Sequence, residues 1–100
     1  MSQTTEGFKI IQDIIKLKWV PEVLNAIGSD SATYTDILKK VDYLSNTELN
    51  RKLAILVERK AVDKIELEGH IRYQLLPFGK DLDHIFRHFR DMEEKYLQIL

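Results

Sequence analysis

The segment of residues 45–75 reads SNTELNRKLAILVERKAVDKIELEGHIRYQL, and its hydrophobic period changes in the middle. It opens with Ser-Asn-Thr-Glu at 45–48, a capping box that predicts a helix start at Ser45, with Leu44 placed to pack on Leu49 across it. The helix that follows would bury a single stripe, made of Leu49, Leu53, Leu56 and Val57. The segment therefore begins as an amphipathic helix.

The second half of the segment alternates apolar and polar residues after residue 61, which predicts a β hairpin. Two loop lengths are compatible with this pattern. A two-residue loop would pair Ile65 with Arg72 and so mix the two faces, whereas a three-residue loop at 68–70 pairs Ile65 with Tyr73. We therefore expect the three-residue loop.

Two helices are expected at the beginning of the chain. Residues 8–17 carry two adjacent apolar stripes, so this helix needs more than one neighbour to cover it. Pro21 suits a first helical turn and Gly28 a helix stop, which together bound a short second helix. The polar stretch at 29–33 that follows is typical of a loop.

A third short helix is expected over residues 34–41, with Thr33 or Thr35 as its cap. Its apolar residues face inward, which leaves Lys39 and Lys40 outside. The predicted order is thus four helices, a hairpin and a last helix.

The last helix follows Pro77 and Gly79, and its apolar residues recur at spacings of four and three to the end of the chain. Such a seam either folds back on its own domain or pairs with another chain. Because the helix at 8–17 also has more apolar surface than one neighbour covers, we expect a homodimer. The expected interface residues are Phe8, Ile11, Ile15, Leu82, Ile85, Phe89, Met92, Tyr96 and Ile99.

The length of 100 residues fits one domain with one core. We divide it into an N-terminal helix at 1–17, a central unit at 18–76 and a C-terminal dimerisation helix at 77–100. No apolar run approaches the ~18 residues of a membrane span, and the polar N-terminus lacks the features of a signal peptide. We therefore expect a cytoplasmic protein without membrane contact.

The chain contains no cysteine, which excludes a disulfide, a thiolate metal site and a thiol redox switch. It has no glycine-rich phosphate loop and no evident Ser-His-acid arrangement, so we expect neither an enzyme nor a cofactor. His84 and His88 have metal-ligand spacing, with Asp81 and Asp91 one turn away, but no certain third ligand. We interpret them as surface residues and expect no metal site.

Three helices followed by a hairpin make a helix-turn-helix with a wing, whose third helix lies in the DNA major groove. From residue 18 to about residue 82 the chain resembles the HxlR family of bacterial and archaeal winged-helix regulators, relatives of the MarR type. The matching pieces are Lys18-Trp19 for the family's K-W, Tyr34-Thr35-Asp36-Ile37 for F-S-E-L, Leu44-Ser45 with Leu49, Leu53 and Leu56 for the recognition helix, and Ile71-Arg72-Tyr73-Gln74-Leu75-Leu76-Pro77-Phe78-Gly79 for V-E-Y-S-L-T-P-L-G.

The resemblance implies a mainly α winged helix-turn-helix with a small β hairpin and a role as a transcriptional regulator, to which the apolar stripes add terminal dimerisation helices. The chain departs from the family in three respects. It lacks the oxidant-sensing cysteine that many members carry near the N-terminus. Its hairpin tip at 68–70 is short, and Leu76 stands where threonine is usual.

On a helical wheel, five residues of the predicted recognition helix lie on its outward face: Asn46, Thr47, Asn50, Arg51 and Ala54. Asparagine can pair with adenine and arginine with guanine, while the cations of this region attract phosphates. We therefore predict double-stranded DNA as the partner. The predicted DNA-binding residues are Asn46, Thr47, Asn50, Arg51, Lys52, Lys39, Lys40, Thr35 and Arg72.

The alternative is a winged-helix module that binds protein rather than DNA. The net charge of -1 and the three carboxylates at Asp63, Glu66 and Glu68 favour it. Residues 45–62 favour DNA, because they carry four cations and two carboxylates. We expect a sequence-specific regulator that binds an inverted-repeat operator as a homodimer.

Overall fold

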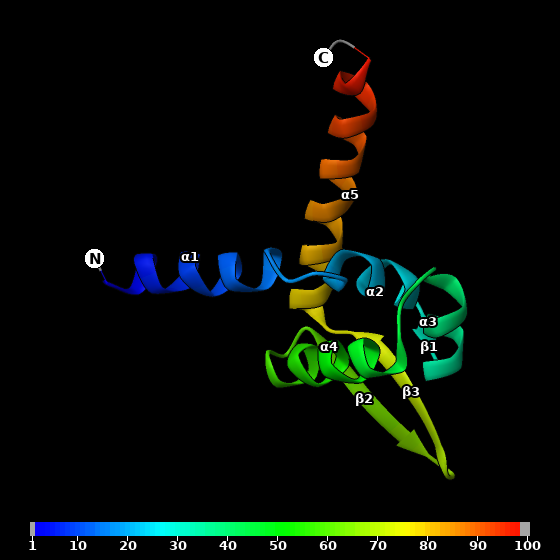
Figure 1. The fold of residues 1–100 in the computed structure, drawn as a ribbon. Coiled ribbons are helices and arrows are strands. Elements are labelled where there is room, and N and C mark those ends of the chain that lie inside the picture. Colours follow the sequence, from blue (N-terminus) through cyan, green and yellow to red (C-terminus); the bar gives the residue numbers. More distant parts are fainter. Residues whose placement is uncertain (1, 99–100) are drawn as a thin grey trace.

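The computed structural model describes residues 2–98, with side chains from residue 7 onward. It is mainly helical with a small antiparallel sheet, so the expected mainly α class with a small β hairpin is confirmed (Figure 1). The elements are α1 (Ser2–Ile15), α2 (Val20–Ile27), β1 (Ser31–Ala32), α3 (Tyr34–Lys40), α4 (Asn46–Glu58), β2 (Val62–Leu67), β3 (His70–Leu75) and α5 (Pro77–Leu97). In the described part of the chain no helix is both long and apolar enough to cross a membrane.

The core lies where α2, α3, α4, the sheet and the first turns of α5 meet. Helix α2 supplies its centre, because both valines and the leucine of its sequence VPEVLNAI are fully buried. The stripe of α4 is buried at Leu49, Leu53 and Leu56, as the sequence indicates. Gly28 ends α2 with a positive φ of 73°, a conformation that glycine adopts without strain.

A third strand occupies part of the predicted loop at 29–33. Strand β1 lies antiparallel to β3, with Ser31 opposite Gln74 and Ala32 opposite Tyr73. Two residues are too few to show a period, and their partner is far away in the sequence, so sequence patterns give no sign of this strand. The strand order is β1-β3-β2.

The hairpin closes through a two-residue loop, so the prediction of a three-residue loop was wrong. Ile65 lies opposite Arg72, and Leu67 lies opposite His70. Glu68 and Gly69 have φ values of 53° and 80°, the paired positive angles of a tight hairpin turn. The prediction assumed that the apolar residues of both strands must lie on the same face of the hairpin. The outer part of the hairpin is exposed to solvent, however, and Leu67 is 68% exposed. No core therefore enforces the alternation there.

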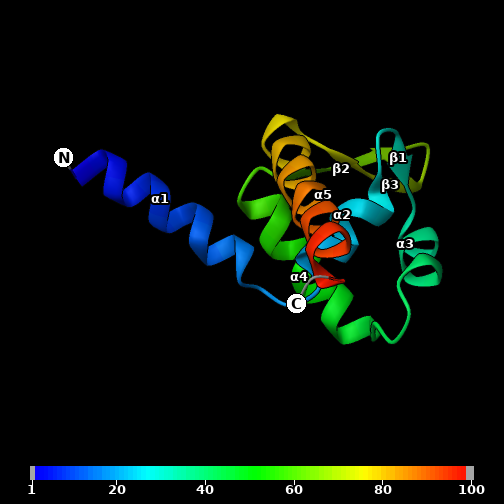
Figure 2. The ribbon, with the colours of Figure 1, turned by 90° about the horizontal axis from the view of Figure 1, so that it is seen from above.

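Helices α1 and α5 extend away from the core in different directions, as two perpendicular views show (Figures 1 and 2). The radius of gyration is 14.7 Å, larger than the ~13 Å typical of a compact chain of this length. Leu82 and Phe86 of α5 are buried in the core, whereas every described residue from 87 on is exposed. The placement of Leu82 in the intermolecular seam was therefore wrong: it fills the core of its own subunit.

Candidate nucleic-acid interface

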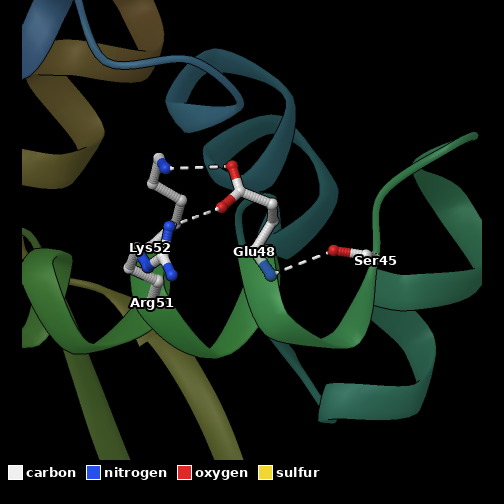
Figure 3. A network of polar contacts seen from close by, with 4 residues as sticks. All are labelled: Ser45, Glu48, Arg51 and Lys52. Carbon is white, nitrogen blue, oxygen red and sulfur yellow. Dashed lines mark hydrogen bonds and ion pairs between the residues drawn. The ribbon is translucent and has the colours of Figure 1, made fainter.

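The start of α4 is held by Ser45, whose hydroxyl accepts a hydrogen bond of 3.1 Å from the backbone N–H of Glu48. This confirms the predicted cap. The second half of the predicted box is absent, because the Glu48 carboxylate turns to Arg51 and Lys52 (Figure 3). A complete box occurs one helix earlier, where Thr33 and Asp36 exchange hydrogen bonds at the start of α3.

The outward face of α4 carries the residues that the helical wheel indicates. Thr47, Asn50, Arg51 and Ala54 are exposed. Asn46 is exposed too, and its side-chain oxygen accepts a hydrogen bond of 2.9 Å from the Tyr34 hydroxyl. A carbonyl oxygen has two acceptor positions, so Asn46 keeps a free one together with its amide donors. Tyr34 thus fixes Asn46 in place, a role that sequence reasoning missed.

Lys52 lies below this surface. Only 7% of the residue is exposed, and its ammonium lies 3.3 Å from a carboxylate oxygen of Glu48. The structure therefore does not bring Lys52 to the surface with the other predicted DNA-binding residues. On a wheel it lies beside Leu49 and Leu56, and its charge alone suggested the outside.

The remaining candidates on α3 are at its two ends. Thr35 is exposed in the first turn, while Thr33 is the residue that caps the helix. Lys39 and Lys40 are both exposed in the last turn. The ammonium of Lys40 also donates a hydrogen bond of 3.2 Å to the backbone oxygen of Ala26, so its position is partly fixed.

Arg72 on β3 is exposed but tethered. Its guanidinium donates to the hydroxyl of Ser31 at 2.7 Å and to the backbone oxygen of the same residue at 3.0 Å. These contacts tie the wing to β1. Hydrogen bonds from Thr33 hold the pKa of the Asp36 carboxyl below its ordinary value, and the positive charge of Arg72 adds to this.

A groove of about 270 Å³ separates α4 from the hairpin. Asn50 and Ala54 line one side and Lys64 the other. Lys64 lies opposite Tyr73 in the sheet, and paired residues share a face, so the buried ring of Tyr73 means that Lys64 faces α4. Sequence reasoning missed this lysine because it assumed a different register. Burial also raises the pKa of the Tyr73 hydroxyl.

Apart from Leu82, which is buried in the core, the predicted dimer residues fall into three groups. Phe8 is 63% exposed on α1, and Phe89, Met92 and Tyr96 are between 43% and 49% exposed on α5. Ile11, Ile15 and Ile85 are half-buried, and Ile99 lies outside the described residues. The ring of Phe89 meets that of Phe86 edge to face, with centroids 6.3 Å apart. A row of apolar side chains thus continues from the core along the exposed part of α5.

His84 and His88 are both exposed on α5. Across the described residues, no group of three or more histidine, aspartate or glutamate side chains is arranged to hold a metal ion.

The family model described as HxlR-like helix-turn-helix matches residues 14–99 of this chain. A search of curated proteins found no match. Among solved structures, the candidate transcriptional regulator ytfH from Salmonella typhimurium has a TM-score of 0.77 at 18% identity, over 90% of this chain and 83% of that one.

Two further solved structures are similar. The reduced form of the transcriptional regulator YodB from B. subtilis has a TM-score of 0.76 at 14% identity, over 88% of this chain and 89% of that one. Sso10a-2, a DNA-binding protein from Sulfolobus solfataricus, has a TM-score of 0.66 at 15% identity, over 80% of this chain and 82% of that one. At these identities the likeness concerns the fold.

Proposed function

Because this chain belongs to the HxlR-like helix-turn-helix family, we propose that it is a transcriptional regulator that binds double-stranded DNA as a homodimer on an inverted repeat. The observation that carries the proposal is the outward face of α4. It offers asparagine, threonine and arginine side chains without an exposed apolar residue larger than alanine. Such side chains form hydrogen bonds with base edges in a major groove.

The proposed contacts divide by chemistry. Asn46, Thr47, Asn50 and Arg51 would read base edges from α4, because they share its exposed face. Lys39, Lys40 and Lys64 would attract phosphates on either side of the helix. Thr35 and Arg72 remain candidates for backbone contacts, with Arg72 limited by its hydrogen bonds to Ser31.

The homodimer proposal is supported by the apolar side chains that α1 and α5 leave in water. Phe8, Phe89, Met92 and Tyr96 are all more than two-fifths exposed. A second copy with the same surface can bury this set by two-fold symmetry. Two recognition helices related in this way reach successive major grooves about 34 Å apart, which would select an inverted-repeat operator.

The known relatives give further support. Two of the similar structures are described as transcriptional regulators and one as a DNA-binding protein. A protein-binding role is the second candidate, and the exposed carboxylates of Asp63, Glu66 and Glu68 on the wing favour it, since they repel phosphates.

Salt titration distinguishes the two functions. The duplex to use is one that the protein itself selects from a randomised pool. If three lysines of each subunit neutralise phosphates, the slope of log K against log salt concentration should be about −5. Removal of one lysine from each subunit, as in Lys39→Ala, should make this slope less steep by about 2. No duplex binding even at low salt would refute DNA binding and favour the protein-binding role.

A further inference from the structure

One carboxylate on α4 joins two cations of very different exposure. The two oxygens of Glu48 lie 3.1 Å from a terminal nitrogen of Arg51 and 3.3 Å from the ammonium of Lys52 (Figure 3). The side chain of Arg51 is 63% exposed, whereas that of Lys52 is only 8% exposed. Glu48 therefore bridges a buried charge and a surface charge.

The buried side of this bridge fixes the carboxylate. A desolvated ammonium requires a nearby opposite charge, and in the described part of the chain Glu48 is the acidic residue paired with Lys52. The Glu48 backbone is also fixed, because its N–H donates to the Ser45 hydroxyl. The position of the Glu48 carboxylate is thus fixed. The ion pair with Arg51 therefore restricts the arginine side chain and not the carboxylate.

The exposed side of the bridge leaves Arg51 able to bind. One terminal nitrogen of Arg51 donates a hydrogen bond to the Glu48 carboxylate, and within the described residues the guanidinium has no other protein acceptor. Nε and the second terminal nitrogen keep their N–H donors, and two donors suffice for the paired contact to guanine.

We propose that Glu48 is a positioning residue for base reading, which holds the Arg51 guanidinium toward one guanine while Lys52 anchors Glu48 from below. This inference rests on the proposed DNA-binding function. Free arginine side chains lose conformational entropy when they bind, and an arginine already held loses less. Glu48 also repels phosphates, which lowers the affinity for every sequence, whereas its hold on Arg51 favours only the sequence that Arg51 recognises.

The test compares E48Q with E58Q. Both substitutions remove one negative charge from α4, but the side chain of Glu58 is 80% exposed at the other end of the helix, and its ion pair among the described residues is with Arg59, at 3.9 Å. The ratio of specific to non-specific duplex affinity should fall about threefold to tenfold in E48Q, the effect of releasing one ordered side chain. In E58Q the ratio should change by less than about twofold, because both affinities rise together.

The base preference at single operator positions gives the second readout. E48Q should lose preference at the position where R51A loses it, and E48Q/R51A should lose no more than R51A alone. A purely structural role of Glu48 would instead weaken all sequences alike. If E48Q does not fold, because Lys52 is left without its partner, E48Q/K52M removes the buried charge and repeats the comparison.

The possible results distinguish failure of the proposed DNA-binding function from failure of the positioning role of Glu48. A wild-type protein that selects no duplex from the randomised pool would refute both the proposed function and this inference. A wild-type protein that selects a duplex, with E48Q and E58Q alike in their ratio or with E48Q and R51A additive, would refute the positioning role and leave DNA binding intact.

Discussion

The backbone carbonyl of Ala61 lies against Gly79, in the space that a side chain at residue 79 would occupy. The same carbonyl accepts a hydrogen bond of 2.9 Å from the N–H of Leu76. One peptide group between α4 and β2 therefore fixes the start of α5. The direction in which α5 leaves the core depends on this contact.

Gly79→Ala should therefore destabilise the fold, although alanine favours helices. Overpacking against backbone typically costs about 1 to 3 kcal/mol, more than the ~1 kcal/mol gained from helix propensity. Thermal unfolding measures the change. Gly7→Ala is the matched control, because a Cβ at Gly7 of α1 meets nothing within 4 Å. If both variants gain stability, the contact does not constrain residue 79.

Ser45→Ala tests the cap of the proposed reading helix. Loss of the hydrogen bond to the Glu48 N–H should cost about 1 kcal/mol, within a range of 0.5 to 2 kcal/mol. Urea unfolding measures the free energy, with Ser29→Ala in an exposed turn as the control. An unchanged midpoint with an unchanged slope would argue against a cap at Ser45.

Arg51→Ala and Lys39→Ala should affect DNA binding differently. Removal of the guanidinium should relax preference at one base position and cost about 1 to 3 kcal/mol there. Removal of the Lys39 ammonium should weaken binding to all sequences and make the salt dependence less steep. Competition binding with singly substituted duplexes separates the two patterns. Equal weakening of every sequence by both variants would contradict the assignment of Arg51.

Phe89→Asp tests the dimer. A carboxylate in a buried apolar interface is strongly unfavourable, so the variant should sediment as a monomer of 11.8 kDa. The wild type should have twice this mass at tens of micromolar protein. His84→Asp is the control, since His84 lines a cavity beside Gly28 and Ser29 instead of the exposed apolar row. A wild-type mass of one chain, independent of concentration, would refute the dimer.

Asp36 predicts a pH dependence of stability. Its pKa is lowered in the folded protein, so its charge stabilises the fold above the ordinary aspartate value of about 3.9. This contribution is lost as the pH falls through the lowered folded-state value. Asp36→Asn, which keeps the shape, should be less stable than the wild type at pH 7, with a smaller difference below about pH 4. An equal difference at both pH values would show that charge is not responsible.

The helices could be predicted from the sequence because their signals are local. The stop at Gly28 and the cap at Ser45 each depend on residues within one turn of the helix end. The stripe of Leu49, Leu53 and Leu56 needs only the helical period. These features do not depend on how the chain packs.

Most of the wrong predictions concern features that depend on packing between residues far apart in the sequence. The register of the hairpin depends on how far the core extends beneath it, and strand β1 exists only because β3 offers it an edge. Leu82 and Phe89 belong to the same predicted seam, yet the core covers one and leaves the other half-exposed. Lys52 is a different case, because its signal is local: it lies beside Leu49 and Leu56 on α4, and Glu48 one turn away pairs with its charge, which a count of charges overlooks.

Helix α1 leaves Phe8 63% and Ile10 47% exposed, and of its described side chains Ile14 and Ile15 pack on the core. A helix of 14 residues is marginal in water when it stands alone. On the dimer proposal, α1 would become ordered only as two chains associate, which couples folding to assembly. Where dimers are scarce, their amount rises roughly as the square of the total protein concentration. Operator occupancy would then respond steeply to the rate of the protein's own synthesis, so that dosage itself acts as a signal.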